Sequence, residues 1–238
     1  MHLADIDYIA VSGKSSMHKA GVFSKIIFTM LLLTSVIITN DIEKILVIIA
    51  ITLAFFFLSG VPLKQVIHMA MYPAFFSLLF AFIMAQQSLL FGLLIVLKAI
   101  SAALLMILLI TTTTYIDLFS FLSLFLPGLL VDIFLFTYRS FFILLSKLSN
   151  LFRSIRLRGG YKPLSLLQNI RNIAGMLGLL VIHSLEMNER MYKIYSLRGY
   201  QGKLPVYGRM SIEGVFDIVL IITGIVILTG VYLPWNLL

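Results

Sequence analysis

The chain has 238 residues, of which 61% are hydrophobic and only 12% are charged, and its mean hydropathy is +1.06. A water-soluble domain carries more charge on its surface, so this composition predicts an integral membrane protein. The absence of cysteine excludes disulfides, thiolate metal sites and a cysteine nucleophile, and the net charge of +8 indicates basic cytoplasmic loops rather than nucleic-acid binding.

The first 20 residues are mostly polar. A secretory signal would place its apolar core earlier and would end in a small-residue cleavage site. Residues 1–20 are therefore predicted to form a retained N-terminal cytoplasmic segment.

Four apolar segments follow within residues 21–114, and a fifth lies within residues 209–238. A helix needs about 20 apolar residues to cross ~30 Å of hydrocarbon, and only the first segment is slightly short of that length. The sequence thus predicts an all-α polytopic membrane protein with about five transmembrane helices. The five segments are Phe23–Thr39, Ile42–Gly60, Val66–Ala85, Leu89–Ile110 and Ile212–Leu233.

Basic residues predict the orientation of these spans. With the N-terminus in the cytoplasm, sixteen Lys or Arg residues lie inside, twelve of them between Arg139 and Arg209. Only Lys44 lies outside, and Lys98 falls within a span. This bias agrees with the positive-inside rule, so we expect a cytoplasmic N-terminus.

Residues 115–208 contain two further apolar stretches, Leu129–Leu148 and Ile173–Leu185. They could form an additional transmembrane hairpin. That arrangement would place Arg153 and its basic neighbours outside, and it would put Asp132 inside a span at a cost of up to a few kcal/mol. We favour long helices at or below the cytoplasmic membrane surface, which form a separate domain before the last span.

Two places in this domain share the sequence Leu-Arg-Gly with a tyrosine close behind. They are Arg158-Gly159 and Arg198-Gly199, the second followed directly by Tyr200. Glycine tolerates the left-handed conformation that ends a helix, and a cation suits the negative end of the helix dipole. Each Leu-Arg-Gly sequence therefore predicts the end of a helix, with an arginine at its tip. One copy alone would indicate ordinary capping, whereas two suit docking into two equivalent grooves of a dimeric partner.

Other ionisable residues give no pattern typical of catalysis. His68 and His183 are isolated and read as packing residues rather than metal ligands, and no glycine-rich phosphate loop is present. Lys98 is a functional candidate by its depth in a span, but we favour a lysine that snorkels to the membrane surface or faces a polar group of a substrate-binding partner. Asp117 and Asp132, on either side of a Pro-Gly turn, could cap helices. Glu186–Arg190 and Glu189–Lys193 have the spacing of helical ion pairs.

Over nearly its whole length the chain resembles the transmembrane coupling (T) component of energy-coupling-factor (ECF) importers, in particular the cobalt-type group. The most specific resemblance is Ser184-Leu185-Glu186, Glu189-Arg190, Tyr192 and Leu197-Arg198-Gly199-Tyr200. Weaker resemblances are Ile6-Asp7, Ala10, His18, Lys25, Thr112-Thr113, Asp117-Leu118, Pro127 and Tyr138-Arg139. The chain departs from the family at Leu157 and Leu197, where a small residue is common.

The resemblance implies a non-enzymatic subunit of an ATP-driven importer in the prokaryotic cell (inner) membrane. Two cytoplasmic ABC-type ATPases would contact Arg158, Gly159, Arg198, Gly199 and Tyr200. Supporting residues of the coupling domain would be Asp117, Pro127, Arg139, Glu189 and Arg190. A small membrane substrate-binding (S) component would capture the substrate, cobalt or nickel, so this chain is expected to hold no cofactor and no metal. A polytopic membrane enzyme acting on lipid headgroups remains the alternative.

Overall fold

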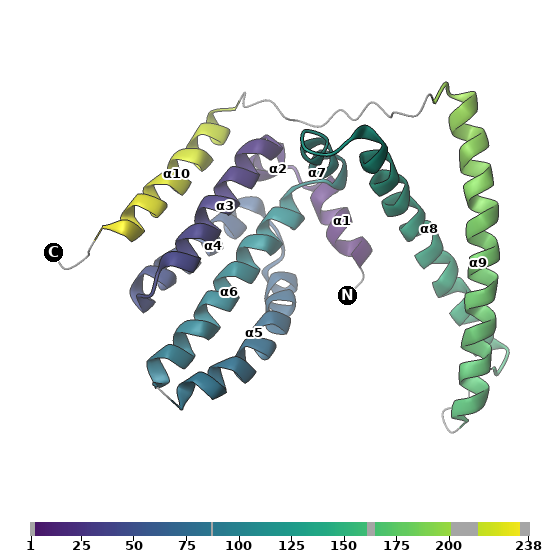
Figure 1. The fold of residues 1–238 in the computed structure, drawn as a ribbon, viewed down its shortest axis with the longest axis horizontal. Helices are drawn as coiled ribbons and strands as arrows, with labels where there is room; N and C mark the ends of the chain where they lie inside the picture. Colours follow the sequence, from purple (N-terminus) through teal and green to yellow (C-terminus); the bar gives the residue numbers. More distant parts are fainter. Residues whose placement is uncertain (1–2, 87, 161–164, 201–213, 234–238) are drawn as a thin grey trace. The chain divides into compact units, whose positions relative to one another are not determined.

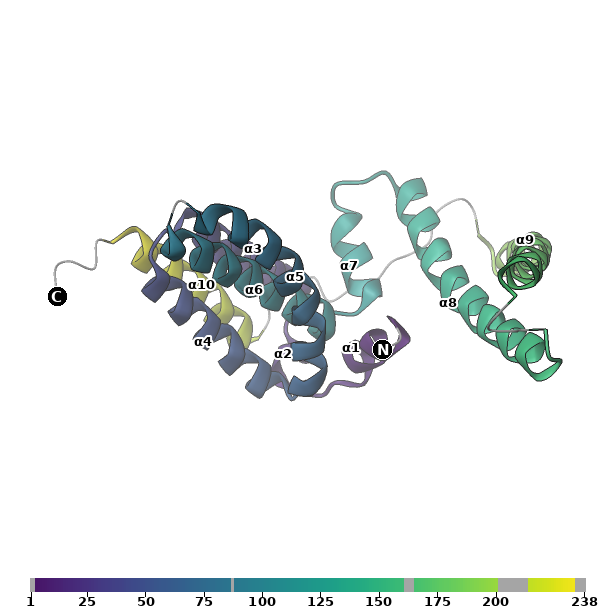
Figure 2. The same ribbon diagram turned by 90° about the horizontal axis from the view of Figure 1, so that it is seen from below.

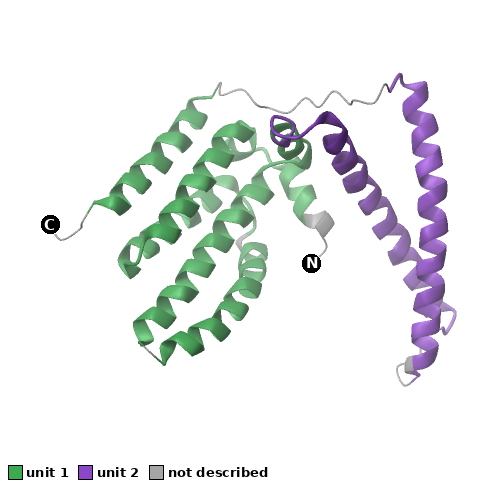
Figure 3. Ribbon diagram, viewed as in Figure 1, with its two compact units in different colours: residues 1–121, 207–238 green, residues 122–206 purple. Residues whose placement is uncertain are grey.

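The chain forms helices arranged in two compact units (Figure 1, Figure 3). The computed structural model describes residues 3–86, 88–160, 165–200 and 214–233. Unit 1 comprises Met1–Phe121 and Tyr207–Leu238, and unit 2 comprises Leu122–Val206. Every regular element in the described ranges is a helix, which confirms the predicted all-α class.

Five apolar helices of unit 1 occupy the segments in which the sequence predicts spans. They are α3 (Val22–Ile38), α4 (Ile42–Ser59), α5 (Leu63–Ala85), α6 (Leu89–Thr112) and α10 (Val215–Tyr232). The last four are long and apolar enough to cross a membrane, whereas α3, with 17 residues, is shorter. α5 continues through Pro73 and is bent in Figure 1, because proline removes a backbone hydrogen bond inside a helix.

The N-terminal segment also folds into helices, α1 (Leu3–Ser12) and α2 (Ser16–Lys19). α1 packs against α6 and α2 packs against α4. Met17 is only 2% exposed and belongs to the hydrophobic core of unit 1. The mostly polar composition of the segment did not predict this packing, because the contact of α2 with the core depends on a single apolar side chain.

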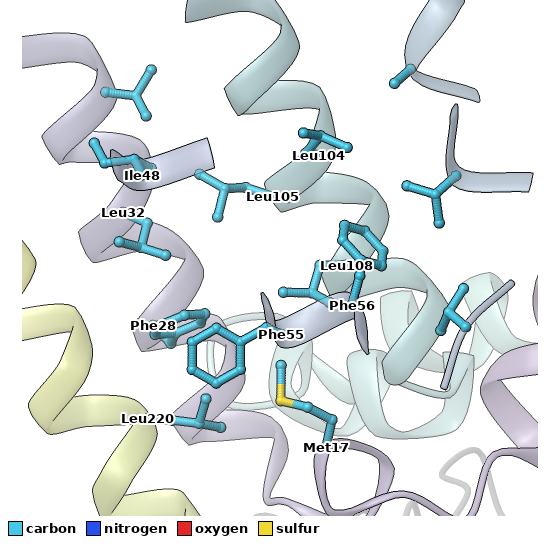
Figure 4. Close-up of a cluster of buried hydrophobic side chains, with 14 of the residues drawn as sticks. Met17, Phe28, Leu32, Ile48, Phe55, Phe56, Leu104, Leu105, Leu108 and Leu220 are labelled. Carbon is cyan, nitrogen blue, oxygen red and sulfur yellow. The ribbon is translucent and has the colours of Figure 1, made fainter. Parts of the chain in front are cut away.

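α6 occupies the centre of unit 1. It packs against α1, α3, α4 and α5, while α10 packs against α3. Figure 4 shows the cluster between these helices, in which the rings of Phe28 and Phe55 meet edge to face at 4.9 Å beside Leu220 of α10. Leu105 and Leu108 contribute the side of α6 that faces this cluster. Burial of these side chains fixes how the membrane helices pack on one another.

Three lysines of unit 1 cap the C-terminal ends of other helices. Each Nζ donates to a backbone carbonyl: Lys25 to Thr112 (2.8 Å), Lys98 to Ile37 (3.0 Å) and Lys44 to Val231 (3.1 Å). The last carbonyls of a helix have no partner within it, and hydrocarbon offers none. A cation there also suits the helix dipole. Lys98 was expected to snorkel or to face a partner protein, and its Nζ here donates to a carbonyl oxygen of α3 in the same unit.

Polar contacts bring the starts of α3 and α10 and the end of α6 to the same end of unit 1. Asp217, in the first turn of α10, accepts hydrogen bonds from Gly21 N (2.8 Å) and Ser24 Oγ (2.6 Å) at the start of α3. His18 Nε2 lies 3.2 Å from the carbonyl oxygen of Thr111 at the end of α6. These neighbours agree with the predicted alternation of the spans.

Unit 2 is built on two long helices, α8 (Gly128–Leu157) and α9 (Leu166–Leu197). The short helix α7 (Tyr115–Leu122), which lies in unit 1 up to Phe121, precedes them in the chain. α8 and α9 pack against each other as an antiparallel pair, seen lengthwise in Figure 1 and with α9 end-on in Figure 2. They also meet the length and composition of membrane spans, but they are the least apolar and least buried of the six helices that do. Length and composition alone therefore leave both predicted arrangements open.

Most large apolar side chains of α8 and α9 are exposed. Among the described residues of these two helices only four are buried: Val131, Asp132, Asn169 and Met176. An apolar helix face of this extent requires burial against lipid or another protein.

Candidate functional site

Both predicted Arg-Gly helix ends are present and share one backbone conformation. Arg158 and Arg198 follow the last residues of α8 and α9, with φ and ψ of −83° and 7° and of −88° and 8°. The glycines after them, Gly159 and Gly199, have φ of +71° and +79°. These values confirm that each Arg-Gly ends a helix and that glycine stands at a left-handed position.

The same pair of hydrogen bonds closes each end. They are Gly160 N to Ile155 O (2.9 Å) with Gly159 N to Arg156 O (3.2 Å), and Tyr200 N to Tyr195 O (3.0 Å) with Gly199 N to Ser196 O (3.1 Å). This Schellman motif satisfies the last carbonyls and fixes the direction in which the chain leaves the helix. A Cβ on Gly159 or Gly199 would meet nothing within 4 Å, so backbone conformation rather than crowding requires glycine.

The two arginines lie on the surface of unit 2. Within the described ranges neither guanidinium has a hydrogen-bond or ion-pair partner, and the preceding residues, Leu157 and Leu197, are 80% and 88% exposed. Each end therefore presents a cation and an adjacent leucine to a partner. We call the segments Leu157–Gly160 and Leu197–Tyr200 the first tip and the second tip.

The two tips lie at opposite ends of the pair formed by α8 and α9. Asn172 Nδ2 donates to the carbonyl oxygen of Gly160, which places the first tip beside the second turn of α9. From Asn172 to Arg198, α9 rises about 39 Å at ~1.5 Å per residue. One continuous helix therefore holds the tips roughly 40 Å apart (Figure 1).

An aromatic cluster fixes the second tip to the start of α8. Tyr200 Oη donates to Asp132 Oδ2 at 2.8 Å, and Asp132 is only 2% exposed. The ring of Phe136 lies 4.8 Å from that of Tyr195 and 5.9 Å from that of Tyr200. Arg139 Nη1 donates to Tyr195 Oη at 3.0 Å. The hydrogen bond to Asp132, followed by desolvation and the carboxylate charge, raises the pKa of Tyr200.

Among the described residues the first tip has no such cluster, and Gly160 stands where the second tip has Tyr200. Tyr200 is half-buried and uses its hydroxyl group inside unit 2. The sequence had indicated Asp132 as a helix cap. The structure places it as the fifth residue of α8, where it accepts from Tyr200, so Asp132 and Tyr200 act together to position the second tip.

Asp117 and Pro127 shape the approach to α8. Asp117 Oδ2 accepts from Thr114 Oγ1 at 2.7 Å, and Thr114 Oγ1 accepts from Asp117 N at 3.3 Å. Thr114 therefore caps α7, and Asp117, which the sequence had indicated as a cap of a following helix, lies within α7 and accepts from the capping hydroxyl group. Pro127 is the N-cap of α8, with φ of −60°, and makes no side-chain cap.

Glu189 and Arg190 lie on the exposed face of α9 near the second tip. The predicted ion pairs Glu186–Arg190 and Glu189–Lys193 are not among the salt bridges between described residues, and Glu186 lies instead 3.3 Å from His183 Nδ1. Solvated pairs on a helix contribute only about 0.3–0.5 kcal/mol, too little to fix long side chains in one geometry.

The two candidate histidines do not belong to a metal site in the described chain. His68 packs edge to face on Tyr72, with ring centroids 5.8 Å apart, and His183 lies beside Glu186. No group of three or more His, Asp or Glu residues among those described could hold a metal ion.

A cluster of buried polar side chains in unit 1 was not predicted from the sequence. It joins His18, Lys25 and Asp217 to backbone at the ends of α3, α6 and α10. Burial, and then the charge of Lys25, lowers the pKa of His18. One feature of the sequence could have indicated this cluster: Lys25 and Asp217 are each an isolated charged residue in the first turn of an apolar helix.

A family model described as CbiQ, cobalt transport protein, matches residues 13–207, a stretch that includes both tips and most of unit 1. The chain belongs to the cobalt transport protein family. No curated protein matches the chain. The match confirms the resemblance to the cobalt-type group, and with the apolar helices it identifies this CbiQ family member as a multi-pass membrane component of cobalt transport.

Proposed function

We propose that this CbiQ family member is the transmembrane coupling subunit of an ECF-type ABC importer. It passes the motion of two cytoplasmic ATPases to a small membrane substrate-binding partner, and it catalyses no reaction itself. One observation carries the proposal: two tips of matched geometry, each with an exposed arginine, end α8 and α9 and stand roughly 40 Å apart along α9.

The matched geometry suits two equivalent grooves. A guanidinium can bind a carboxylate through two parallel hydrogen bonds, which fixes direction as well as affinity. Because Arg158 and Arg198 leave their helices with the same backbone angles, two copies of one ATPase can receive them in the same way. Closure of the ATPase dimer around ATP then moves the tips, and α8 and α9 transmit the displacement as rigid levers.

The exposed apolar faces of α8 and α9 supply the other side of this coupling. Such faces suit burial against a small apolar membrane protein that captures cobalt or nickel and is rocked by the levers. The substrate then lies in the partner, and the described residues of this chain need contribute no ligand to it.

The charge distribution supports a prokaryotic inner-membrane location with the N-terminus and unit 2 in the cytoplasm. Leu122–Val206 contains eleven Lys or Arg residues against three Asp or Glu residues, and so carries the entire net charge of +8. Unit 1 is formally neutral by the same count. Basic segments of this kind stay on the cytoplasmic side of a membrane.

The test is the double variant R158A/R198A, co-expressed with the two ATPases and the substrate-binding partner. Hydrogen bonds to charged groups contribute about 1.5–3 kcal/mol each, so ATPase capture and cobalt uptake should both fall at least about tenfold. The control K147A removes a cation from α8 about three turns before the first tip and should retain both activities. Membrane insertion should be normal in both variants. Unchanged capture and uptake in R158A/R198A would refute the proposed role.

A further inference from the structure

A cleft of about 620 Å³ lies between the end of α8 and the start of α9, wholly within unit 2. Its lining combines two arginines with aliphatic side chains: Arg153, Arg156, Ile155, Ile173 and Met176. No acidic side chain lies among its described lining residues. The cleft therefore offers cations on one wall and an apolar surface on another.

The surrounding sequence strengthens the positive field of the cleft. Between Asp132 and Glu186 the chain has seven Lys or Arg residues and no Asp or Glu. Within the described ranges Arg153 and Arg156 have no carboxylate partner. Their guanidinium groups are one turn apart on α8 and can both donate to one phosphate, the anion that arginine binds best through paired hydrogen bonds.

The apolar part of the cleft and its neighbourhood distinguish a lipid from a soluble anion. Ile155 and Ile173 line the cleft, and Ile173 is 38% exposed. On the same helix segments Leu167 and Ile170 are 85% and 62% exposed. A free phosphate would leave these aliphatic surfaces uncovered. Cations beside exposed apolar side chains are typical of a surface that lies in the headgroup region of a membrane.

We propose that this cleft binds an acidic membrane phospholipid. The phosphate lies against Arg153 and Arg156, and the glycerol and the first part of an acyl chain lie against the aliphatic wall. Asn172 connects this site to the first tip, because it lines the cleft and donates to the Gly160 carbonyl oxygen. A bound lipid therefore holds the Arg158 end of the lever at the cytoplasmic membrane surface. Lipid binding itself does not depend on the coupling role.

The test is native mass spectrometry of the full chain in detergent, titrated with phosphatidylglycerol or with phosphatidylcholine. Both lipids present a phosphate to the arginines, but the choline cation leaves phosphatidylcholine without net charge. The chain should therefore retain phosphatidylglycerol with at least about tenfold higher affinity, since attraction of an anionic lipid contributes about 1 kcal/mol per arginine. R153Q/R156Q should lose this preference, whereas the control K147Q/K193Q, which removes the same total charge from α8 and α9 away from the cleft, should keep it. R153K/R156K should weaken binding, because lysine cannot form the paired hydrogen bonds.

Three outcomes would overturn the proposal. Equal retention of both lipids by the unmodified chain would do so without any variant. Equal losses in R153Q/R156Q and K147Q/K193Q would show diffuse surface attraction instead of a site. Displacement of phosphatidylglycerol by inorganic phosphate at the same concentration would identify a soluble-anion site. Because ATPase capture is not measured, none of these results depends on the proposed coupling role.

Discussion

Single charged side chains in this protein stabilise the ends of helices. Lys25, Lys44 and Lys98 donate to terminal carbonyls, and Asp217 accepts from Gly21 N and Ser24 Oγ at the start of α3. In unit 2, Asp132 plays a comparable part, because its carboxylate accepts a hydrogen bond from the hydroxyl group of Tyr200. The presence of these charged side chains in apolar surroundings is thus explained by the hydrogen bonds that they make to backbone groups at helix ends or to a phenol hydroxyl group.

Substitution of Tyr200 by phenylalanine tests the role of Asp132 in positioning the second tip. The variant Y200F removes one hydrogen bond from a buried carboxylate and keeps the ring, so we expect a loss of about 1–2 kcal/mol in the free energy of unfolding of unit 2. Denaturant titration of the chain in detergent measures it. The control is Y192F on the exposed face of α9, where Tyr192 is 71% exposed and the change should stay within ~0.5 kcal/mol. Equal behaviour of the two variants would contradict a positioning role.

The helix ends carry the proposed function, and the glycine after each arginine makes them possible. Gly159 and Gly199 adopt a left-handed conformation in open surroundings, whereas Gly175 lies inside α9 with nothing within 4 Å of a Cβ built on it. The same change, glycine to alanine, therefore tests two opposite effects on a single helix.

We expect G199A to destabilise the chain by about 1–2 kcal/mol, because a Cβ is strained in the left-handed region. G175A should stabilise it by about 0.5–1 kcal/mol, because alanine loses less entropy than glycine in a helix. Thermal unfolding in detergent, followed by helical signal, measures both. A stabilising G199A would show that the second tip does not need its Schellman geometry.

Local signals account for the elements that the sequence predicted well. Apolar runs of nearly 20 residues indicated the five apolar helices of unit 1, and the two Arg-Gly sequences indicated the ends of α8 and α9. Each of these signals lies within a few turns of chain. The bond between Asp132 and Tyr200 joins residues 68 positions apart, and that between Lys25 and Thr112 joins residues 87 positions apart. Such pairs depend on how the helices pack, so the sequence indicated neither. Pro163 and Pro205, each just beyond one Arg-Gly helix end and consistent with a stop there, lie outside the described residues.

At the scale of the whole molecule, charge separates the two units. Unit 1 is apolar and formally neutral, and unit 2 carries the net charge of +8 and has little core of its own. This division suits a membrane anchor joined to levers that complete their burial with partners. It also makes the side of the membrane on which unit 2 lies the central claim, since ATPases and ATP are found only in the cytoplasm.

Labelling of single cysteines in sealed cells tests that claim most directly, because the chain has no cysteine of its own. Ser154, near the end of α8, and Glu43, at the start of α4, are both exposed. A membrane-impermeant maleimide should label E43C from outside and should reach S154C only after the membrane is permeabilised. Labelling of S154C in sealed cells would place the hairpin across the membrane and contradict the coupling role.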